Sequence, residues 1–356
     1  MIRQVANHNG ESAILVLGGG GARGIAHFGV YRSLVDAGFK VDRMVGTSMG
    51  AMVGAVLATT PPDCSPAEAE RWAIDYLGSE RFRAHREALG GSSPWNGAAS
   101  SAGLLGWLDS LWSYVRSHAA IGKLLRRPAL LDATVVEAAL EELVPDIDLS
   151  ETNIPLSIVA VDLLSGHRIV LERGPLRRAL QASMAIPGIF PPVPWDGMLL
   201  GDLGVLESLP TEVAASYPGE LIIASDVAPS MEYVRQCPSA IHALLRMDEI
   251  GERLFRRHAQ QFAHLLIQPQ VGQFQWWDFA RADDIIRRGE EAARQAIARW
   301  NAASQAMSTA AATSAAGDRL PTERFRLWQW FLGNASNSTS KTSTKPAAEA
   351  SPTRHR

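Results

Sequence analysis

The apolar stretch Ala13-Ile14-Leu15-Val16-Leu17 runs directly into Gly18-Gly19-Gly20-Gly21-Ala22-Arg23-Gly24, and this junction decides the fold class. Five consecutive apolar residues that end at glycine are typical of a strand buried on both faces of a parallel sheet. Residues 24–37 then carry apolar side chains at helical spacing and end at Gly38, which favours a helix with a glycine after its last turn. The start of the chain therefore predicts a strand, a glycine-rich loop and a helix.

A second strand and a second helix follow. Residues 41–45 are mainly apolar and stop at Gly46, and residues 49–58 are rich in Ala, Val and Met. Strand, loop, helix, strand, turn and helix in this order are typical of a parallel sheet with helices on both faces. We therefore expect an α/β protein with three layers, α/β/α, around a mainly parallel central sheet.

The rest of the chain divides by composition. The expected divisions are an N-terminal extension at 1–12, one α/β domain at 13–300 with a mainly helical insertion at 65–142, a helical or partly ordered segment at 301–332 and a disordered tail at 333–356. Further strands are expected at 156–161, 167–171, 198–200 and 221–225, and further helices at 175–185, 238–268 and 283–303.

Composition excludes several classes of protein. Hydrophobic residues make up 46% of the 356 residues and charged residues 20%, as in ordinary globular proteins. The net charge is −3, from 34 basic and 37 acidic residues, so no overall basic excess favours nucleic acid as a partner. The two cysteines, Cys64 and Cys237, fit neither a disulfide framework nor a metal motif.

The sequence shows no export or membrane-spanning segment. The first eleven residues are mostly polar, and the apolar run at 13–17 is too short for the core of a signal peptide. No stretch of about 20 apolar residues occurs. We expect a cytoplasmic protein that makes peripheral contact with membranes.

A serine occupies the turn after the second strand. The residues Gly46-Thr47-Ser48-Met49-Gly50 form a G-x-S-x-G pattern between a predicted strand and a predicted helix. Such a turn lifts the serine on a tight elbow, and the following helix directs its N-terminal amide dipoles at the same place. A glycine-flanked turn with Ser48 as a helix N-cap is the simpler interpretation of this motif taken alone.

The glycine-rich loop has two interpretations. Gly19, Gly21 and Gly24 match the G-x-G-x-x-G pattern of dinucleotide-binding proteins, but Asp42 precedes the apolar end of the second strand instead of following it. No Gly-Lys-Ser/Thr follows, as a phosphate-binding P-loop requires. Alternatively, consecutive glycine amides stabilise an oxyanion during acyl transfer. A donor loop and a serine elbow on neighbouring strands explain each other, so we favour the oxyanion hole.

The position of the serine distinguishes two hydrolase architectures. Only 47 residues precede Ser48, which is room for about two strands. In the standard α/β-hydrolase arrangement the nucleophile follows several strands, so this sequence does not fit that arrangement.

These motifs resemble those of the patatin-like phospholipases, of the bacterial type related to the esterase domain of neuropathy target esterase. The resemblance also extends to segments beyond the first two motifs. The matching blocks are residues 19–30, 45–51, 161–166, 182–193 and 201–206, in the order of the family. Five ordered blocks between about residues 13 and 230 are more specific than any single motif.

The resemblance implies a patatin-like fold and a catalytic dyad. Ser48 is the implied nucleophile and Asp202 the implied general base. The resemblance also implies that a loop stabilises the oxyanion, with Arg23 shaping it. The residues of that loop are Gly19, Gly20, Gly21, Ala22, Arg23 and Gly24. A serine–carboxylate dyad is chemically coherent, because a desolvated carboxylate is basic enough to accept the serine proton.

The segment around the aspartate departs from the family pattern. The family usually has glycine after this aspartate, whereas this chain has Asp202-Leu203-Gly204. If that position requires a positive φ, Leu203 is strained there and activity is lowered. Histidines 242, 258 and 264 follow Asp202 in the chain, but surface or helix-packing roles are favoured over a triad. His27, on the first helix, is expected to be a packing residue.

Two aromatic segments bear on membrane contact. Residues 107–115 and 325–332 are rich in Trp, Leu and Phe; core packing is the favoured role for both, and contact with a lipid–water interface is the alternative. Together these features predict a hydrolase of lipid or lysolipid esters that needs no metal or organic cofactor. The alternatives are a non-catalytic regulatory or lipid-binding protein with the same fold and, less favoured, a nucleotide-binding protein.

Overall fold

The computed structural model describes residues 12–84, 129, 131–204, 206–217, 221–231 and 233–315. The chain divides into two units, residues 1–303 and residues 304–356. The strands are β1 (Ser12–Leu17), β2 (Lys40–Thr47), β3 (Leu156–Asp162), β4 (Arg168–Leu171), β5 (Val193–Trp195), β6 (Met198–Gly201), β7 (Leu221–Ser225) and β8 (Leu265–Ile267). The α-helices are α1 (Ala26–Asp36), α2 (Met49–Thr59), α3 (Pro66–Gly78), α7 (Thr134–Leu143), α8 (Leu176–Ser183), α9 (Thr211–Ala215), α10 (Ala240–Ala259) and α11 (Ala282–Ala315).

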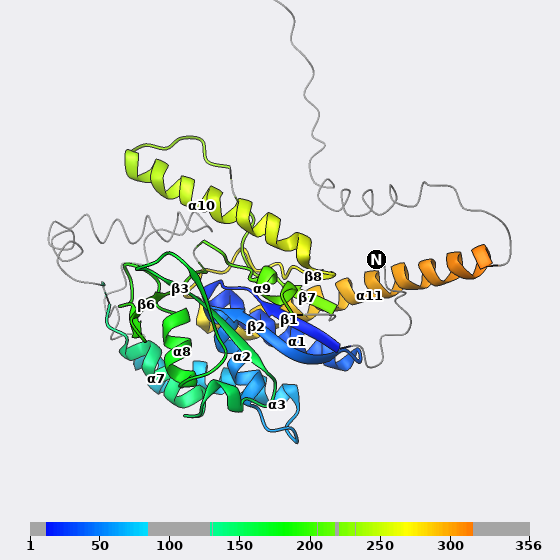
Figure 1. The fold of residues 1–356 in the computed structure, drawn as a ribbon, viewed down its shortest axis with the longest axis horizontal. Coiled ribbons are helices and arrows are strands. Elements are labelled where there is room, and N and C mark those ends of the chain that lie inside the picture. Colours follow the sequence, from blue (N-terminus) through cyan, green and yellow to red (C-terminus); the bar gives the residue numbers. More distant parts are fainter. Residues whose placement is uncertain are drawn as a thin grey trace, which may run out of the picture. The chain divides into compact units, whose positions relative to one another are not determined.

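One mixed sheet forms the centre of the first unit (Figure 1). Its strand order is β5-β6-β3-β2-β1-β7-β8, and β4 pairs with β3 beside this path. Strands β3, β2, β1, β7 and β8 are parallel to their neighbours in that run, whereas β4, β5 and β6 are joined by antiparallel pairs. The fold is thus α/β with a mainly parallel central sheet, as the sequence predicts.

Helices cover both faces of this sheet, and β1 shows why. Ala13, Leu15 and Leu17 face one hydrophobic cluster, which includes buried residues of α1, α2, α3, α7, α8 and α11. Ile14 and Val16 face the opposite cluster, which includes residues of α9 and the end of α10. Because successive side chains of a strand point to opposite faces, an unbroken apolar strand needs apolar cover on both sides.

The predicted elements agree with the structure in the first βαβα unit; two of the later expected helices have the wrong bounds, and two short elements were not expected. The helix expected at 238–268 ends at Ala259, and residues 265–267 form strand β8. The helix expected at 283–303 continues to Ala315. Strand β5 and helix α9 were not predicted from the sequence, because segments of 3 and 5 residues are too short to show a period.

Several expectations fall on residues outside the described ranges. These include the N-terminal extension up to residue 11, the central part of the helical insertion with its Trp-rich segment at 107–115, and the C-terminal segments at 316–332 and 333–356. Within the described ranges, no helix is both long enough and apolar enough to cross a membrane.

Candidate active site

Ser48 lies on a strained turn between β2 and α2. Its backbone has φ 52° and ψ −128°, a region that residues with a Cβ rarely adopt. The backbone N–H of Ser48 donates to Ser183 Oγ at 2.9 Å, and Ser183 Oγ in turn donates to the carbonyl oxygen of Val159 at 2.6 Å. Ser183, at the end of α8, therefore ties the elbow to strand β3.

The other elbow residues allow close packing. A Cβ on Gly50 would lie only 2.1 Å from the carbonyl oxygen of Leu17, so only glycine lets α2 begin against the end of β1. Gly46 packs against Ala51 in the same way. Thr47 is fully buried, while Ser48 and Met49 are partly exposed. The turn thus presents Ser48 to solvent from a rigid base.

Asp202 follows strand β6 and is 2% exposed. The side chain of Ser48 lies close enough to this carboxylate to lower its pKa. The N–H of Gly204 donates to Asp202 Oδ1 at 2.7 Å, and the N–H of Asp202 itself donates to the carbonyl oxygen of Ala185 at 2.9 Å. Burial raises the pKa of Asp202 to about 6, against the lowering effect of the hydrogen bonds from Ser48 and Gly204.

Gly204 shows how closely the two groups approach. A Cβ at this position would lie 2.9 Å from Asp202 Oδ1 and 3.5 Å from Ser48 Cβ. Leu203, which takes the place of the usual family glycine, is not among the described residues with positive φ. Its side chain is 7% exposed and packs in the apolar cluster with Leu209 and Val213. The backbone of Leu203 therefore does not have the positive φ that would strain a leucine, and its side chain is buried in this apolar cluster.

The glycine loop runs from the end of β1 into a short 3-10 helix, Gly21–Ile25. The N–H of Gly19 donates to the carbonyl oxygen of Ser208 at 2.8 Å, and the N–H of Ala22 donates to that of Trp276 at 2.6 Å. These two amides are therefore engaged within the protein. Among the described residues, the amides of Gly20, the N-cap of this 3-10 helix, and Gly21, its first residue, donate to no other group of the protein.

Arg23 and Gly24 hold the loop in place. The Nε of Arg23 donates to the carbonyl oxygen of Gly20 at 3.2 Å, which closes the loop on itself. Burial, with the nearby positive charge of Arg256, lowers the pKa of Arg23 to about 10. Gly24 faces Met49 at the start of α2, where a Cβ would lie 2.6 Å from Met49 Cγ. The loop and the serine elbow therefore pack against each other.

His27 does more than pack in the core, because its ring bonds to residues at the ends of both β1 and β7. It is fully buried, with Nε2 2.8 Å from the carbonyl oxygen of Gly18 and Nδ1 2.8 Å from Ser225 Oγ. A carbonyl only accepts, so Nε2 carries the proton and Nδ1 accepts from Ser225. Burial lowers the pKa of His27 to about 4, so the ring is neutral at physiological pH. The sequence signal was its position one turn after the glycine loop.

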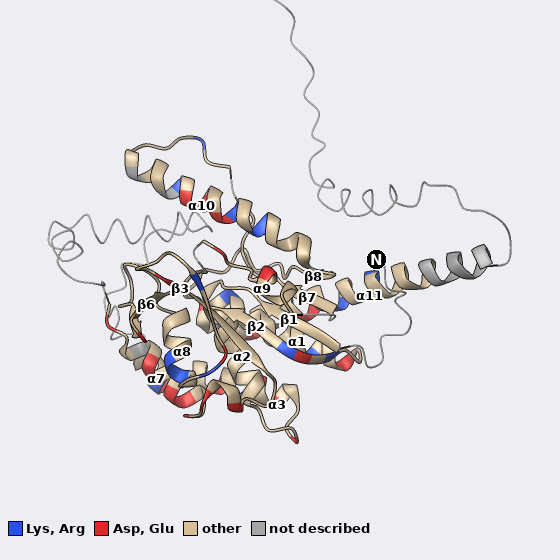
Figure 2. Ribbon diagram, viewed as in Figure 1, with Lys and Arg blue, Asp and Glu red and all other residues tan. Residues whose placement is uncertain are grey.

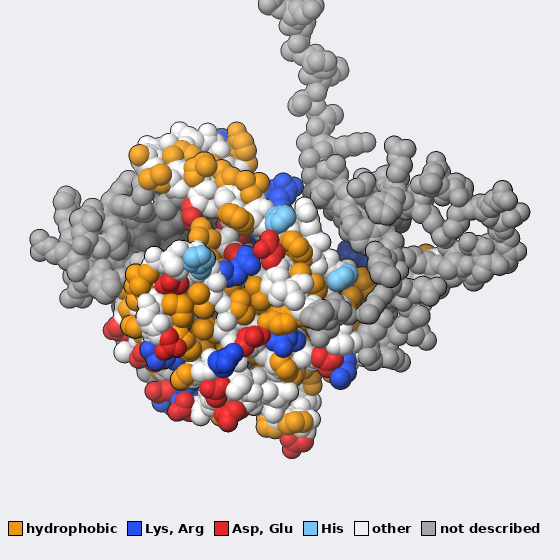
Figure 3. All heavy atoms as spheres, in the orientation of Figure 1, with side chains coloured by type: hydrophobic (Ala, Val, Ile, Leu, Met, Phe, Trp, Pro, Cys, Tyr) orange, Lys and Arg blue, Asp and Glu red, His pale blue; other side chains and the backbone are white. Residues whose placement is uncertain are grey.

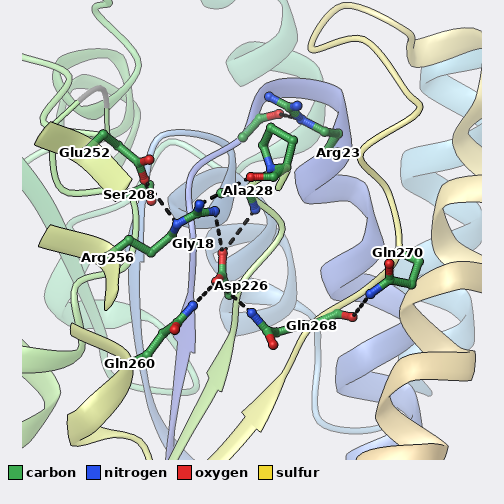
Figure 4. Close-up of polar contacts among 12 residues, drawn as sticks. Gly18, Arg23, Ser208, Asp226, Ala228, Glu252, Arg256, Gln260, Gln268 and Gln270 are labelled. Atoms are coloured by element: carbon green, nitrogen blue, oxygen red, sulfur yellow. Dashed lines mark hydrogen bonds and ion pairs between the residues drawn. The ribbon is translucent and has the colours of Figure 1, made fainter. Parts of the chain in front are cut away.

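A buried polar network, which sequence reasoning missed, supports the same loop from α10 (Figure 4). Asp226, directly after β7, accepts from Gln260 Nε2 at 2.7 Å and lies 3.6 Å from Arg256 Nη1. Glu252 accepts from the hydroxyl of Ser208, the residue whose carbonyl receives Gly19 N–H. A signal was available: Asp226 follows an apolar strand, where loops of α/β proteins carry polar groups.

A small apolar cluster lies beside the glycine loop. Trp276 and Trp277 contact each other edge to face, with ring centroids 5.5 Å apart, and the carbonyl of Trp276 holds the glycine loop. Ile186, Ile189 and Phe190 belong to the segment that follows Ser183. The members of this cluster are Leu131, Ile186, Ile189, Phe190, Trp276 and Trp277.

The remaining candidates have structural partners. His264 Nδ1 accepts from the N–H of Ile222 at 2.9 Å, and His258 lies 3.4 Å from Glu212. His242 contacts Ser239 at the N-cap of α10. Asp162 caps its own turn by accepting from Ser165 Oγ at 2.6 Å and lowers its pKa to about 2 in doing so. No group of three metal-ligating side chains occurs among the residues that the structure describes.

The family model of the patatin-like phospholipases matches residues 15–215, which is more than half of this chain. The chain therefore belongs to the patatin-like phospholipase family. It is 33% identical over 221 residues to an uncharacterised NTE family protein of Mycobacterium tuberculosis, a match that covers 62% of this chain and 50% of the relative. Patatin-like phospholipase domain-containing protein 7 of Mus musculus is 26% identical over 318 residues, covering 82% of this chain and 21% of that protein.

This chain spans half the length of that mycobacterial relative. Among solved structures, human GIVD cytosolic phospholipase A2 has a TM-score of 0.40 and 12% identity, covering 84% of this chain and 62% of that one. VipD from Legionella pneumophila has a TM-score of 0.39 and 15% identity, covering 83% of this chain and 67% of that one.

Proposed function

We propose that this protein hydrolyses carboxylic esters of lipids or lysolipids by a Ser48–Asp202 dyad. The observation that carries the proposal is the approach of the partly exposed Ser48 to the buried Asp202 carboxylate on either side of Gly204, together with the burial that raises the pKa of Asp202 to about 6. A carboxylate with a raised pKa is a better proton acceptor and is still ionised at neutral pH. Family membership supports the same reaction class.

The reaction follows from these positions. Ser48 Oγ attacks the ester carbonyl carbon while its proton passes to Asp202, and the carbonyl oxygen becomes an oxyanion. The amides of Gly20 and Gly21 are the loop donors available for that oxyanion, since Gly19 and Ala22 donate to carbonyl oxygens of the protein. The carbon–oxygen bond to the leaving alcohol then breaks as Asp202 returns the proton to that oxygen.

Water completes the cycle. Asp202 takes a proton from a water molecule, whose oxygen attacks the acyl carbon on Ser48. The second tetrahedral intermediate releases the carboxylic acid, and Ser48 Oγ recovers its proton from Asp202. No step in this sequence requires a metal or an organic cofactor.

The apolar cluster favours a lipid acyl group over a small polar ester. Trp276, Trp277, Ile186 and Phe190 are partly buried apolar side chains of one cluster, and Trp276 contacts the loop that carries the oxyanion donors. Contact with such side chains stabilises a bound alkyl chain by about 0.8 kcal/mol for each methylene removed from water. We therefore expect kcat/KM to rise with acyl length.

The test is a panel of lipid and lysolipid esters, with wild type, Ser48→Ala and Asp202→Asn compared. Exposed residues that lie outside the site provide matched controls, Ser216→Ala and Asp63→Asn. We expect both site variants to lose about 10³-fold or more in turnover, and both controls to keep it. Wild type without turnover on any ester would instead indicate a non-catalytic lipid-binding or regulatory protein.

A further inference from the structure

Helix α10 has its apolar side toward solvent. Leu244, Met247, Leu254 and Phe255 are 60–66% exposed, although all four are large and hydrophobic. At about 100° per residue they fall within an arc of about 100° and form one stripe along the helix. Figure 3 shows hydrophobic side chains gathered over this helix. A surface helix normally turns such a stripe toward the core.

The opposite side of α10 is polar and is fixed to the protein. Arg256 is 8% exposed, lies 3.6 Å from Asp226 Oδ1, and donates to the carbonyl oxygen of Pro229 at 3.2 Å. One turn earlier, Glu252 accepts from Ser208. Rotating α10 to bury its apolar stripe would break these contacts and leave buried charges unpaired. The outward position of the stripe is therefore set by the network of Figure 4.

The charges beside the stripe indicate what covers it. Arg257 and Arg253 lie on one side of the stripe, about 60° and about 100° around the helix from Leu254, and neither has an ion-pair partner among the described residues. Figure 2 shows that α10 carries both positive and negative residues. Such an arrangement fits the surface of an anionic lipid bilayer. The apolar stripe would contact the acyl chains, while the aliphatic part of each arginine stays in the apolar layer and its guanidinium group reaches the phosphates of the head groups.

The inward side of α10 is connected to the candidate site. Leu163, Leu164 and Leu206 are 43%, 68% and 44% exposed, and the methyl groups of Leu163 approach Gly201, the residue before Asp202. Through Glu252 and Ser208, α10 is tied to the same loop that carries the oxyanion donors. A lipid layer on the stripe would therefore lie across α10 from the loop that carries the proposed oxyanion donors.

We propose that the outward stripe of α10 (Leu244, Met247, Leu254 and Phe255, with Arg253 and Arg257 on one side) docks the protein on an anionic lipid surface. This inference rests on the proposed lipid-ester hydrolysis for its biological purpose, but its physical basis is the reversed orientation of the helix.

The test is co-sedimentation of the full chain with vesicles of phosphatidylcholine alone and of phosphatidylcholine mixed with phosphatidylglycerol. We expect wild type to bind the anionic vesicles, and the double variant Leu254→Gln/Phe255→Gln to bind them at least tenfold more weakly. Arg253→Gln/Arg257→Gln should lose the preference for anionic vesicles. The control is Trp72→Gln, which removes a 42% exposed apolar side chain from α3 and should bind like wild type. Far-ultraviolet circular dichroism and melting curves establish that each variant is folded.

Two outcomes would overturn the docking proposal. One is equal vesicle binding by wild type and Leu254→Gln/Phe255→Gln. The other is a wild type that does not bind vesicles but sediments as a dimer, with the double variant monomeric, since the stripe would then be covered by a second copy of the chain. Turnover of a water-soluble short-chain ester by wild type, measured without vesicles, reports on the proposed function separately. Vesicle binding without such turnover would leave docking standing and remove the esterase proposal.

Discussion

Ser183 Oγ accepts a hydrogen bond from the backbone N–H of Ser48 at 2.9 Å and donates one to the carbonyl oxygen of Val159 at 2.6 Å. This pair of hydrogen bonds stabilises a turn whose φ of 52° is unfavourable for serine. We predict that Ser183→Ala lowers kcat at least tenfold with little change in KM, because the elbow relaxes while the substrate surface remains.

The same variant should lower the free energy of unfolding by about 1–3 kcal/mol, since it leaves the Ser48 N–H without an acceptor. Steady-state kinetics and urea denaturation measure the two effects. Ser216→Ala, on the exposed end of α9, serves as the control. Unchanged kcat and stability in Ser183→Ala would show that this contact does not hold the elbow.

A methyl group on Gly204 should separate the two proposed catalytic groups. It would lie 2.9 Å from Asp202 Oδ1 and 3.5 Å from Ser48 Cβ, closer than the carboxylate tolerates. We predict that Gly204→Ala reduces kcat/KM by about 10²-fold. Gly78→Ala is the matched control, because a Cβ there would meet nothing within 4 Å. Equal losses in the two variants would point to a general cost of replacing glycine.

Asp202 should destabilise the folded protein at neutral pH. Burial raises its pKa from 3.8 to about 6 in the folded state, so folding favours the protonated acid. The cost of keeping it ionised is absent below pH 3.8, grows as the pH rises through this window, and is complete above pH 6. We predict that Asp202→Asn raises the free energy of unfolding at pH 8 by on the order of 2–3 kcal/mol and changes it little near pH 4. Urea titrations at the two pH values measure this; a variant less stable than wild type at pH 8 would contradict it.

His27 should make the free energy of unfolding rise with pH, whereas Asp202 makes it fall. Burial lowers its pKa from 6.5 to about 4 in the folded state, so folding favours the neutral ring. This contribution is complete above pH 6.5 and is lost as the pH falls toward 4, by on the order of 3 kcal/mol. His27→Leu cannot bind Gly18 or Ser225, and we predict a loss of about 1–3 kcal/mol at pH 7.5 with a flatter profile between pH 6.5 and 4. A profile as steep as that of wild type would mean that other groups cause it.

The first strands and the meeting of Ser48 with Asp202 could be predicted from the sequence, for different reasons. An apolar run ended by glycine leaves few choices for β1, so local pattern was enough there. The approach of Asp202 to Ser48 is a long-range contact, and only the ordered blocks of a resemblance indicated it. Ser183 lies within one of those blocks, yet nothing in the sequence indicates that its hydroxyl reaches the Ser48 amide.

The end of α10 and its orientation could not be predicted. Apolar residues continue at helical spacing through Leu265 and Leu266, so the pattern does not show where helix ends and β8 begins. An amphipathic pattern is the same whichever side faces the protein. The outward turn of Leu254 and Phe255 depends on the buried contacts of Arg256 with Asp226, which bring together residues from two separate segments.

The most direct test of the dyad is the rate at which a fluorophosphonate modifies Ser48, followed by mass spectrometry as a function of pH in wild type and Asp202→Asn. The account predicts that the wild-type rate rises with pH through an apparent pKa near 6, the value that burial gives to Asp202, and that the Asp202→Asn rate is at least 10²-fold lower at pH 8. Equal rates of Ser48 modification in the two proteins, with the same pH profile, would contradict it.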